Sequence, residues 1–543
     1  MTSPVAGGPA DQPAPHERFA RDAVVVTICT LLSRMTGFVR VLVAAACLGV
    51  DLLGDTYSAA NTIPNIIFEL VAGGVLQAVL VPTFVAARRE GGDEELGRAA
   101  ALVASTLTAF LAAIAVVGIA LSPIITRLLV HAGGNTATAD DKRALMGRML
   151  IVFVPQIIFY GVGMVSTAAL AARRRFMAAA LAPAVNNLIV ITCYLVYRST
   201  LHGATPSLHL SPLQFALIAG GTSVAVVVFT AVPAIVLTRQ GVPWRPRWDP
   251  RSDVVRGVRR AFGWAMLSVA GTLAPTAAAV VLGYGAPGGV AVFTMTFAFF
   301  VLPHALVAVP VATTVAPRAA DAWQREQLDT VRSLIERSVQ VVAPLLLASG
   351  AAMAALAWPI GRIASSFGDA DAHGVAPIAH ALVVFGCGLV GYGVAFTMTR
   401  LLFSLGDVRR ASILVTVSAA IGVAGMVVAS TAFDHTERAA ALALGYCATQ
   451  LISAVLLTAR VRRLTGAPSW SASGRLGVAS VAAAICAGGV ITLVRSPFGT
   501  SRSAAAGAVL VAGAAGAAVF VGLVAVLAGV RPSQLVPRGR RAI

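Results

Sequence analysis

Residues 24–48 read VVVTICTLLSRMTGFVRVLVAAACL, and this stretch decides the class of fold. It is longer than the roughly 20 apolar residues with which a helix crosses a bilayer core of about 30 Å. The same stretch carries Arg34 and Arg40. Counted from Ala23 at about 1.5 Å per residue, Arg34 lies roughly 16 Å deep and Arg40 roughly 25 Å deep. Because a charge at membrane depth is costly, both arginines are predicted to serve a function.

The whole chain shares this apolar character. It has 543 residues, of which 57% are hydrophobic and 12% are charged. A soluble domain has about 25% charged residues, so this chain lacks the polar material for a large water-exposed surface. Apolar runs between turn and charge signals predict about fourteen membrane-spanning helices. We expect an all-α integral membrane protein with two six-helix lobes around a central cavity, because paired halves are common among secondary transporters.

The predicted spans and loops divide the chain into six parts. They are a cytoplasmic N-terminal segment (1–22), an N-lobe of helices 1–6 (23–238), an interfacial linker (239–257), a C-lobe of helices 7–12 (258–462), helices 13–14 (463–530) and a basic cytoplasmic tail (531–543). Trp244 and Trp248 in the linker are typical of a segment at the membrane interface.

The charges of the loops alternate along the chain. Arginines cluster in every second loop, whereas the alternate loops are poorer in cations; the clusters lie at 88–98, 173–175, 239–251, 318–332, 409–410, 460–475 and 531–541. Cytoplasmic loops are enriched in Lys and Arg, so the pattern predicts both termini in the cytoplasm and a multi-pass protein of the inner (plasma) membrane. The formal net charge of +18 has the same explanation. Because the cations form no single basic face, we expect no nucleic-acid partner.

The second predicted span carries a polar face. Thr62, Asn65 and Glu69 share one side of a helix by the three-and-four spacing. Glu69 lies near the depth of Arg34, and we expect it to pair with Arg34 or Arg40 in a water-accessible cavity. Such a pair could simply join two helices. However, two cations and one anion leave positive charge unbalanced, and this favours an anionic ligand.

Other polar residues and motifs are less informative. His304 fits a cavity-lining position on a broken helix or a packing role, and Asn186 and Asn187 fit hydrogen bonds between helices. The chain contains no Walker-type phosphate loop, no helix with histidines spaced for zinc and no serine elbow. We therefore expect no catalytic residues, no metal and no cofactor, and an ion gradient or the membrane potential as the energy source.

Several segments resemble a known family. Residues 33–40 (SRMTGFVR) resemble the SR-x-x-GF-x-R signature that opens the MurJ (MviN) lipid II flippases. Residues 54–57 (GDTY) and 63–67 (IPNII) are similar to the segments that follow it in that family. Weaker similarities include Arg175-Phe176 and the run 308–317. The resemblance covers essentially all the predicted spans, and the first two helices are its specific part.

The resemblance implies a fold and a cargo. The family belongs to the multidrug/oligosaccharidyl-lipid/polysaccharide exporter superfamily, with two six-helix lobes and, in MurJ, two further helices thought to form a groove for the lipid tail. The implied cargo is lipid II, a polyprenyl pyrophosphate that carries the peptidoglycan disaccharide-peptide. It would be flipped from the cytoplasmic to the outer leaflet by alternating access. The resemblance suggests an actinobacterial member, and it implies a cytoplasmic regulatory domain or partner and the cell-wall synthesis machinery as partners besides membrane lipids.

Matching the motifs carries over Arg34, Arg40 and Asp55 as substrate-binding residues, to which the polar face adds Asn65 and Glu69. Two family cations are missing, since this chain has Phe68-Glu69 in helix 2 and residues 297–299 (FAF) in helix 8. The cavity is therefore expected to be less positive than in relatives. Three other hypotheses stay open at this point: a polysaccharide-lipid flippase or drug exporter with the same fold, a membrane glycosyltransferase that uses a lipid-linked sugar, and a non-transporting scaffold.

Overall fold

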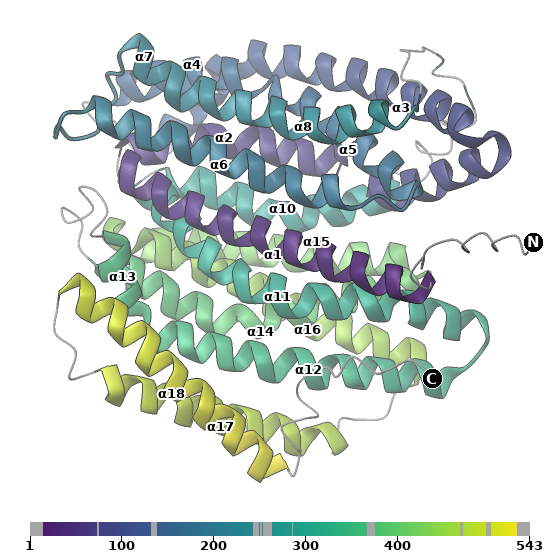
Figure 1. Cartoon of the computed structure of the whole chain (residues 1–543). Coiled ribbons are helices and arrows are strands. Elements are labelled where there is room, and N and C mark those ends of the chain that lie inside the picture. Colours follow the sequence, from purple (N-terminus) through teal and green to yellow (C-terminus); the bar gives the residue numbers. More distant parts are fainter. Residues whose placement is uncertain are drawn as a thin grey trace, which may run out of the picture.

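The structure is a computed structural model, and it describes residues 15–50, 52–72, 75–131, 138–242, 249, 252, 263–284, 286–365, 375–466, 471–495 and 501–528. Every regular element in these ranges is a helix (Figure 1). The whole predicted tail lies outside the described residues. So do Gly73 and Gly74 and most of the predicted N-terminal segment and linker, including Trp244 and Trp248.

The number of membrane crossings agrees with the prediction. Thirteen described stretches are helical, long and apolar enough to cross a membrane. One of them, Leu80–Val130, has 51 residues, which is far more than the roughly 20 that one crossing needs. Its helix α3 leaves helical geometry at Gly91 (φ −140°) and Gly92 (φ 66°). The part of α3 before this bend, together with α2 (Leu52–Ala72), covers the second predicted span, and the part after the bend covers the third. The described helices thus cover the fourteen predicted spans, and the all-helical membrane fold is confirmed.

The helices form two bundles (Figure 1). The first bundle contains α1 (Pro15–Leu48), α2 (Leu52–Ala72), α3 (Val75–His131), α4 (Ala139–Phe153), α5 (Gln156–Ala172), α6 (Met177–Thr200), α7 (Pro212–Phe215), the π-helix η1 (Ala216–Gly220) and α8 (Gly221–Arg239). The second bundle contains α10 (Gly263–Gly283), α11 (Gly289–Gln324), α12 (Leu328–Ala355), α13 (Ala357–Ser365), α14 (Ala376–Ser404), α15 (Val408–Ala432), the 3₁₀ turn η3 (His435–Glu437) and α16 (Arg438–Thr465). Helices α17 (Ser471–Arg495) and α18 (Arg502–Ala528) pack mainly on each other and on α12 and α13 of the second bundle.

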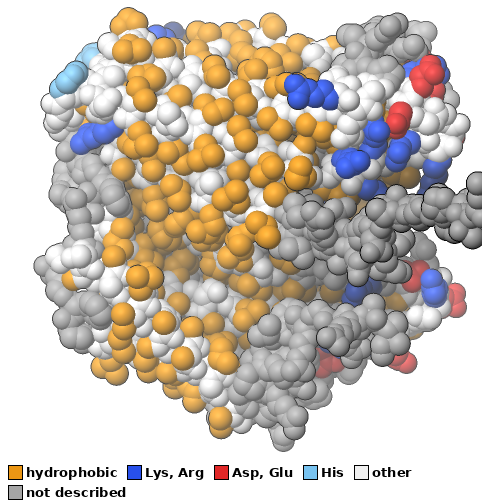
Figure 2. Space-filling view, in the orientation of Figure 1, with side chains coloured by type: hydrophobic (Ala, Val, Ile, Leu, Met, Phe, Trp, Pro, Cys, Tyr) orange, Lys and Arg blue, Asp and Glu red, His pale blue; other side chains and the backbone are white. Residues whose placement is uncertain are grey.

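The two ends of the molecule differ in charge. The end on the right of Figure 1 holds the bend of α3, the α5–α6 turn and the α11–α12 turn, where arginines cluster, and we call it the basic end. The other end, with the α1–α2 and α10–α11 turns, is the distal end. Figure 2 shows a broad apolar belt between the two ends, with most of the visible charged side chains at the basic end. An apolar belt bounded by charge is the surface that a bilayer requires.

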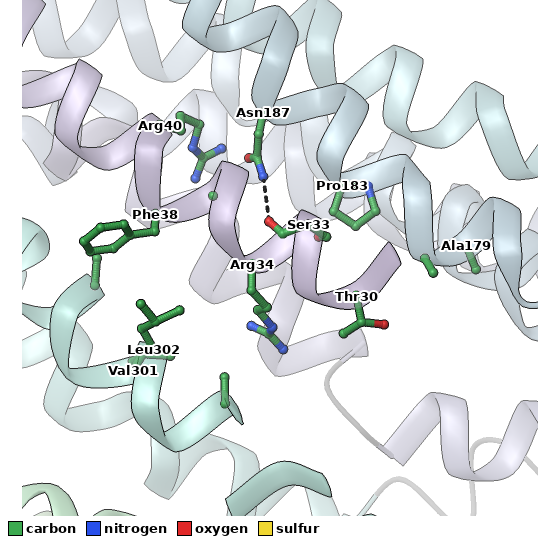
Figure 3. A pocket seen from close by; sticks show the side chains of 14 residues that line it. Thr30, Ser33, Arg34, Phe38, Arg40, Ala179, Pro183, Asn187, Val301 and Leu302 are labelled. Atoms are coloured by element: carbon green, nitrogen blue, oxygen red, sulfur yellow. Dashed lines mark hydrogen bonds between the residues drawn. The ribbon is translucent and has the colours of Figure 1, made fainter. Parts of the chain in front are cut away.

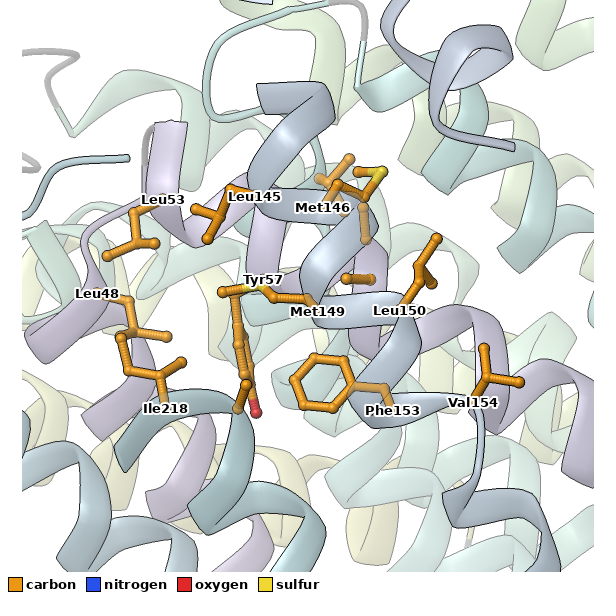
Figure 4. Packing of buried hydrophobic residues seen from close by; sticks show 14 of the residues in the cluster. Leu48, Leu53, Tyr57, Leu145, Met146, Met149, Leu150, Phe153, Val154 and Ile218 are labelled. Atoms are coloured by element: carbon orange, nitrogen blue, oxygen red, sulfur yellow. The ribbon is translucent and has the colours of Figure 1, made fainter. Parts of the chain in front are cut away.

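The hydrophobic cores join the bundles at the distal end. Leu48, Tyr57 and Phe153 of the first bundle form one buried cluster with Tyr284 and Val290 of the second (part of this cluster is shown in Figure 4). Towards the basic end, each bundle has its own cluster. One is built around Leu80–Phe84 and α5, and the other around α12 and the end of α14. In the conformation described, the bundles are therefore sealed to each other at the distal end.

Candidate functional site

Arg34 and Arg40 line a pocket between the bundles. The pocket has a volume of about 540 Å³ and is bounded by α1, α6 and α11. Both arginines extend from α1 into it, and Val301 and Leu302 of α11 lie on the opposite side (Figure 3). We call it the arginine pocket. The two charges that stand out in the sequence thus share one space.

The residues around these arginines place α1 against α6. The side-chain amide of Asn187 on α6 donates hydrogen bonds to the Ser33 carbonyl oxygen (3.3 Å) and to the Thr36 hydroxyl (3.2 Å). A Cβ atom on Gly37 would lie 3.3 Å from the same amide nitrogen, so a glycine here permits the close approach of the two helices. The predicted role of Asn187 in joining helices is confirmed.

Neither arginine has a protein partner in the described part of the chain. No hydrogen bond or ion pair there engages the guanidinium of Arg34 or Arg40. Arg34 is exposed and Arg40 is half-buried. A guanidinium group that is removed from water needs compensating acceptors. Two unpaired guanidinium groups in one pocket therefore provide a site for an anion, and phosphate oxygens suit their forked donor geometry.

A second cavity lies inside the first bundle. It has a volume of about 590 Å³, is lined by α1, α2, α5, α6 and α8, and holds Asn65 and Glu69. We call it the N-bundle cavity. Arg40, Ala179 and Pro183 border both spaces, so the arginine pocket and the N-bundle cavity adjoin each other. Arg40 can reach a ligand in either of them.

Helix α2 presents a polar face to the N-bundle cavity. Asn61, Asn65 and Glu69 form this face, and Phe68 lies beside them at the cavity. The face is rotated slightly from the predicted one, because Thr62 does not line the cavity. Asn65 donates to the Asn61 carbonyl oxygen at 2.8 Å. The Phe68 ring stacks on Tyr160 of α5 with centroids 4.8 Å apart, and this packing fixes the rotation of α2.

The predicted ion pair of Glu69 with Arg34 or Arg40 is wrong for this conformation. Glu69 and Arg40 line the same cavity, yet the described residues offer Glu69 no ion-pair partner within 4.0 Å. The Tyr392 hydroxyl on α14 lies within range of the charges of both Glu69 and Arg34. Glu69 lines the N-bundle cavity and Arg34 lines the arginine pocket, so the two charges lie in adjoining spaces without meeting.

Asp55 lies away from both pockets and holds the bundles together. It is 1% exposed, and its carboxylate accepts hydrogen bonds from the backbone N–H groups of Gly288 (2.7 Å), Val290 (3.1 Å) and Ala291 (2.8 Å). Three N–H groups at the start of α11 suit an anion because they lack partners within the helix and lie at its positive end. Asp55 thus connects α2 to α11 across the distal end.

Two further contacts belong to this distal connection. The hydroxyl groups of Thr56 and Tyr284 lie 3.0 Å apart. Lys142, which is the one lysine of the chain and is 6% exposed, has its Nζ atom 5.4 Å from the centre of the Tyr284 ring. We call Asp55, Thr56, Lys142, Tyr284 and the start of α11 the distal latch. Sequence reasoning missed Tyr284 and Lys142, because only the packing of α4 and α10 brings them to Thr56.

His304 has a packing role. It is 3% exposed, its ring centre lies 4.0 Å from that of Tyr392, and Phe396 meets it edge-on at 5.0 Å. Helix α11 is continuous past it, from Gly289 to Gln324. Of the two predicted possibilities, the structure favours packing over a cavity-lining position on a broken helix.

The comparisons with known proteins agree with this architecture. The family model described as lipid II flippase MurJ matches residues 44–505, a range that begins after Arg34 and Arg40. The probable lipid II flippase MurJ of Rhizobium tropici is 26% identical over 375 residues, which is 68% of each chain. The lipid II flippase MurJ of Burkholderia cenocepacia is 25% identical over 379 residues, covering 68% of this chain and 70% of the relative.

Solved structures show the same fold. The structure titled lipid II flippase MurJ, inward closed conformation, superposes with a TM-score of 0.72 at 16% identity and covers 93% of this chain and 98% of that one. An inward-facing multidrug resistance MATE family transporter has a TM-score of 0.62 at 14% identity, covering 82% and 100%. At these identities the structures establish the fold alone, whereas the sequence match establishes the family. The chain is therefore a polytopic membrane transporter, and it belongs to the lipid II flippase MurJ family.

Proposed function

We propose that this chain flips lipid II across the plasma membrane by alternating access. The observation that carries the proposal is that Arg34 and Arg40, which have no partner among the described residues, line one pocket between two bundles that are sealed at one end. Membership of the family supports lipid II as the cargo. The negatively charged pyrophosphate of such a lipid would bind the guanidinium groups of Arg34 and Arg40 in this pocket.

The direction of transport follows from the charges at the two ends. Cytoplasmic loops collect arginine, so the basic end is assigned to the cytoplasm, as are both termini. The distal end then faces the outside and is closed by the distal latch. The described conformation would accept cargo from the cytoplasmic leaflet, and release would require Asp55 to leave the start of α11. Asp55 is thus proposed to act in the conformational change and not in direct contact with the cargo.

The lipid tail needs a different environment from the headgroup. The arginine pocket is bounded by α1 of one bundle and α11 of the other, so a headgroup could enter between them while its tail stays in the bilayer. Helices α17 and α18 are proposed to provide the groove for that tail. In an actinobacterial cell the polyprenyl chain would be decaprenyl, and the cell-wall synthesis machinery and a cytoplasmic regulatory domain would be the further partners.

Depletion of the chain followed by a leaflet-specific assay of lipid II tests this function. We expect lipid II to accumulate in the cytoplasmic leaflet and the intact chain to restore its outer-leaflet level. Arg34→Ala should fail to restore it, because the charge-assisted contact that it removes amounts to about 1.5–3 kcal/mol, or roughly a tenfold to hundredfold weaker hold on the pyrophosphate. Arg89→Ala, an exposed arginine at the basic end, serves as the matched control and should restore transport fully. Normal outer-leaflet lipid II after depletion would refute the proposal.

A further inference from the structure

Glu69 gives the N-bundle cavity a charge opposite to that of the arginine pocket. Glu69 is exposed to the cavity, and the described residues place no cation within ion-pairing distance of its carboxylate. A carboxylate at membrane depth without a partner is costly. The arrangement therefore points to a cationic group that arrives with a ligand.

The other wall of the same cavity carries Arg40, whose guanidinium is also unpaired in the described part of the chain. The cavity thus presents one free anion and one free cation, side chains of α2 and α1 that do not neutralise each other. A wholly anionic ligand would satisfy Arg40 and be repelled by Glu69. A ligand that carries an ammonium and a carboxylate together satisfies both groups.

A neutral group strengthens this reading. Asn186 on α6 is one of the residues that line the N-bundle cavity. Its Oδ1 atom is buried and accepts no hydrogen bond from the described residues. Buried polar atoms are normally hydrogen-bonded, so this oxygen is ready for an N–H group. The cavity volume of about 590 Å³ lies within the usual range of small-molecule sites, about 300–1,000 Å³.

We propose that the N-bundle cavity binds a zwitterionic amino-acid group, with its ammonium at Glu69 and Asn186 and its carboxylate at Arg40. The inference rests on the proposed function, because the headgroup peptide of the cargo is the nearest source of such a group. A peptide supplies carboxylate groups and, wherever a free amine remains, an ammonium group. A free amino acid has the same chemistry, and the experiment separates the two sources.

The test compares two lipid-linked headgroups that differ by one charge. Proteoliposomes with the full chain receive a lipid-linked disaccharide-peptide whose peptide amine is either free or N-acetylated. The intact chain should transport the free-amine form at least about tenfold faster, which corresponds to the loss of one charge-assisted contact. Glu69→Gln should transport both forms at similar rates, and Glu69→Lys should favour the acetylated form. Glu90→Gln, an exposed carboxylate at the basic end, should keep the preference of the intact chain.

Two outcomes would overturn the inference, and a third would identify the ligand as a soluble amino acid. Equal transport of both forms by the intact chain would contradict it. So would a Glu69→Gln variant that slows both forms equally and loses its dependence on a sodium or proton gradient, since Glu69 would then serve the coupling ion. Uptake of radiolabelled free lysine that depends on Glu69 would support the zwitterion site and assign it to a soluble ligand. If the intact chain moves neither lipid under any gradient, the proposed function fails, and binding of the two forms then tests the cavity alone.

Discussion

At the scale of single residues, Gly37 and Asn187 set the position of both arginines. The Asn187 amide ties the turn of α1 between Ser33 and Thr36 to α6, and Arg34 extends from that same turn. A side chain at position 37 would meet this amide. The glycine and the asparagine therefore act as one unit, although they are far apart in the sequence.

Enlarging Gly37 should disturb the arginine pocket. We expect Gly37→Leu to lower stability by about 1–3 kcal/mol, the usual cost of overpacking, and to reduce transport because α1 must move away from α6. Gly37→Ala should be nearly neutral, since its Cβ atom needs a shift of only a few tenths of an ångström. Thermal unfolding in detergent measures the effect. Gly488→Leu is the control, because a Cβ atom there meets nothing within 4 Å, and an equal loss in this variant would contradict the packing argument.

The same scale shows what sequence can and cannot predict. Arg34 and Arg40 are conspicuous because they interrupt an apolar run, but their six-residue spacing does not place them on one face of a helix, so their shared pocket depends on how α6 and α11 pack around α1. Glu69 has a matching depth, but depth does not fix the rotation of α2 about its axis. That rotation depends on contacts such as Phe68 on Tyr160, so the expected ion pair could not be tested by spacing alone.

At the scale of elements, the junction of α2 with α11 decides whether the distal end is closed. A carboxylate at a helix N-terminus combines hydrogen bonds with the favourable field of the helix. Asp55 reaches three N–H groups of another bundle in this way. The sequence marks Asp55 through its family motif, but the chain carries no local signal that its partner is the start of α11, 233 residues away.

Replacing the carboxylate should loosen this junction. Asp55→Asn keeps the size of the side chain but removes the charge and one acceptor oxygen, which should weaken the closed state by about 1.5–3 kcal/mol. Cys47 is 3% exposed and belongs to the core cluster at the distal end, so it reports opening. We expect maleimide labelling of Cys47, followed by mass spectrometry, to be roughly tenfold or more faster in the variant. Asp434→Asn, an exposed carboxylate at the same end, should label like the intact chain, and unchanged labelling of Asp55→Asn would contradict the latch.

At the scale of the whole molecule, the two bundles share one hydrophobic core at the distal end and have separate cores towards the basic end. Interiors at protein packing density resist gradual deformation, so two bundles with separate cores at the basic end are expected to move as two bodies. The sequence predicted the helices and their two-lobed grouping because hydropathy and loop charge act locally. It did not predict which end is sealed, because that depends on contacts between distant helices such as α2 and α10.

Locking the sealed end should stop transport. The hydroxyl groups of Thr56 and Tyr284 lie 3.0 Å apart. In a Thr56→Cys, Tyr284→Cys double variant the thiols lie farther apart, because cysteine is shorter than tyrosine by the length of the ring, so the reagent must bridge that gap. Cross-linking with a short thiol-reactive reagent should abolish flipping, and a cleavable linker should allow recovery on reduction. Each single variant, treated identically, controls for the loss of the hydroxyl contact. Full activity of the cross-linked double variant would show that the bundles need not part at this end.

Helices α17 and α18 rest mainly on α12 and α13 of the second bundle. They would therefore move together with the second bundle, and any rotation of that bundle would carry them through the surrounding lipid. A fluorophore on α18 would trace this swing from outside the transport path. If α17 and α18 hold the lipid tail as proposed, the tail would be displaced laterally in the membrane while the headgroup of the same lipid passes between the bundles.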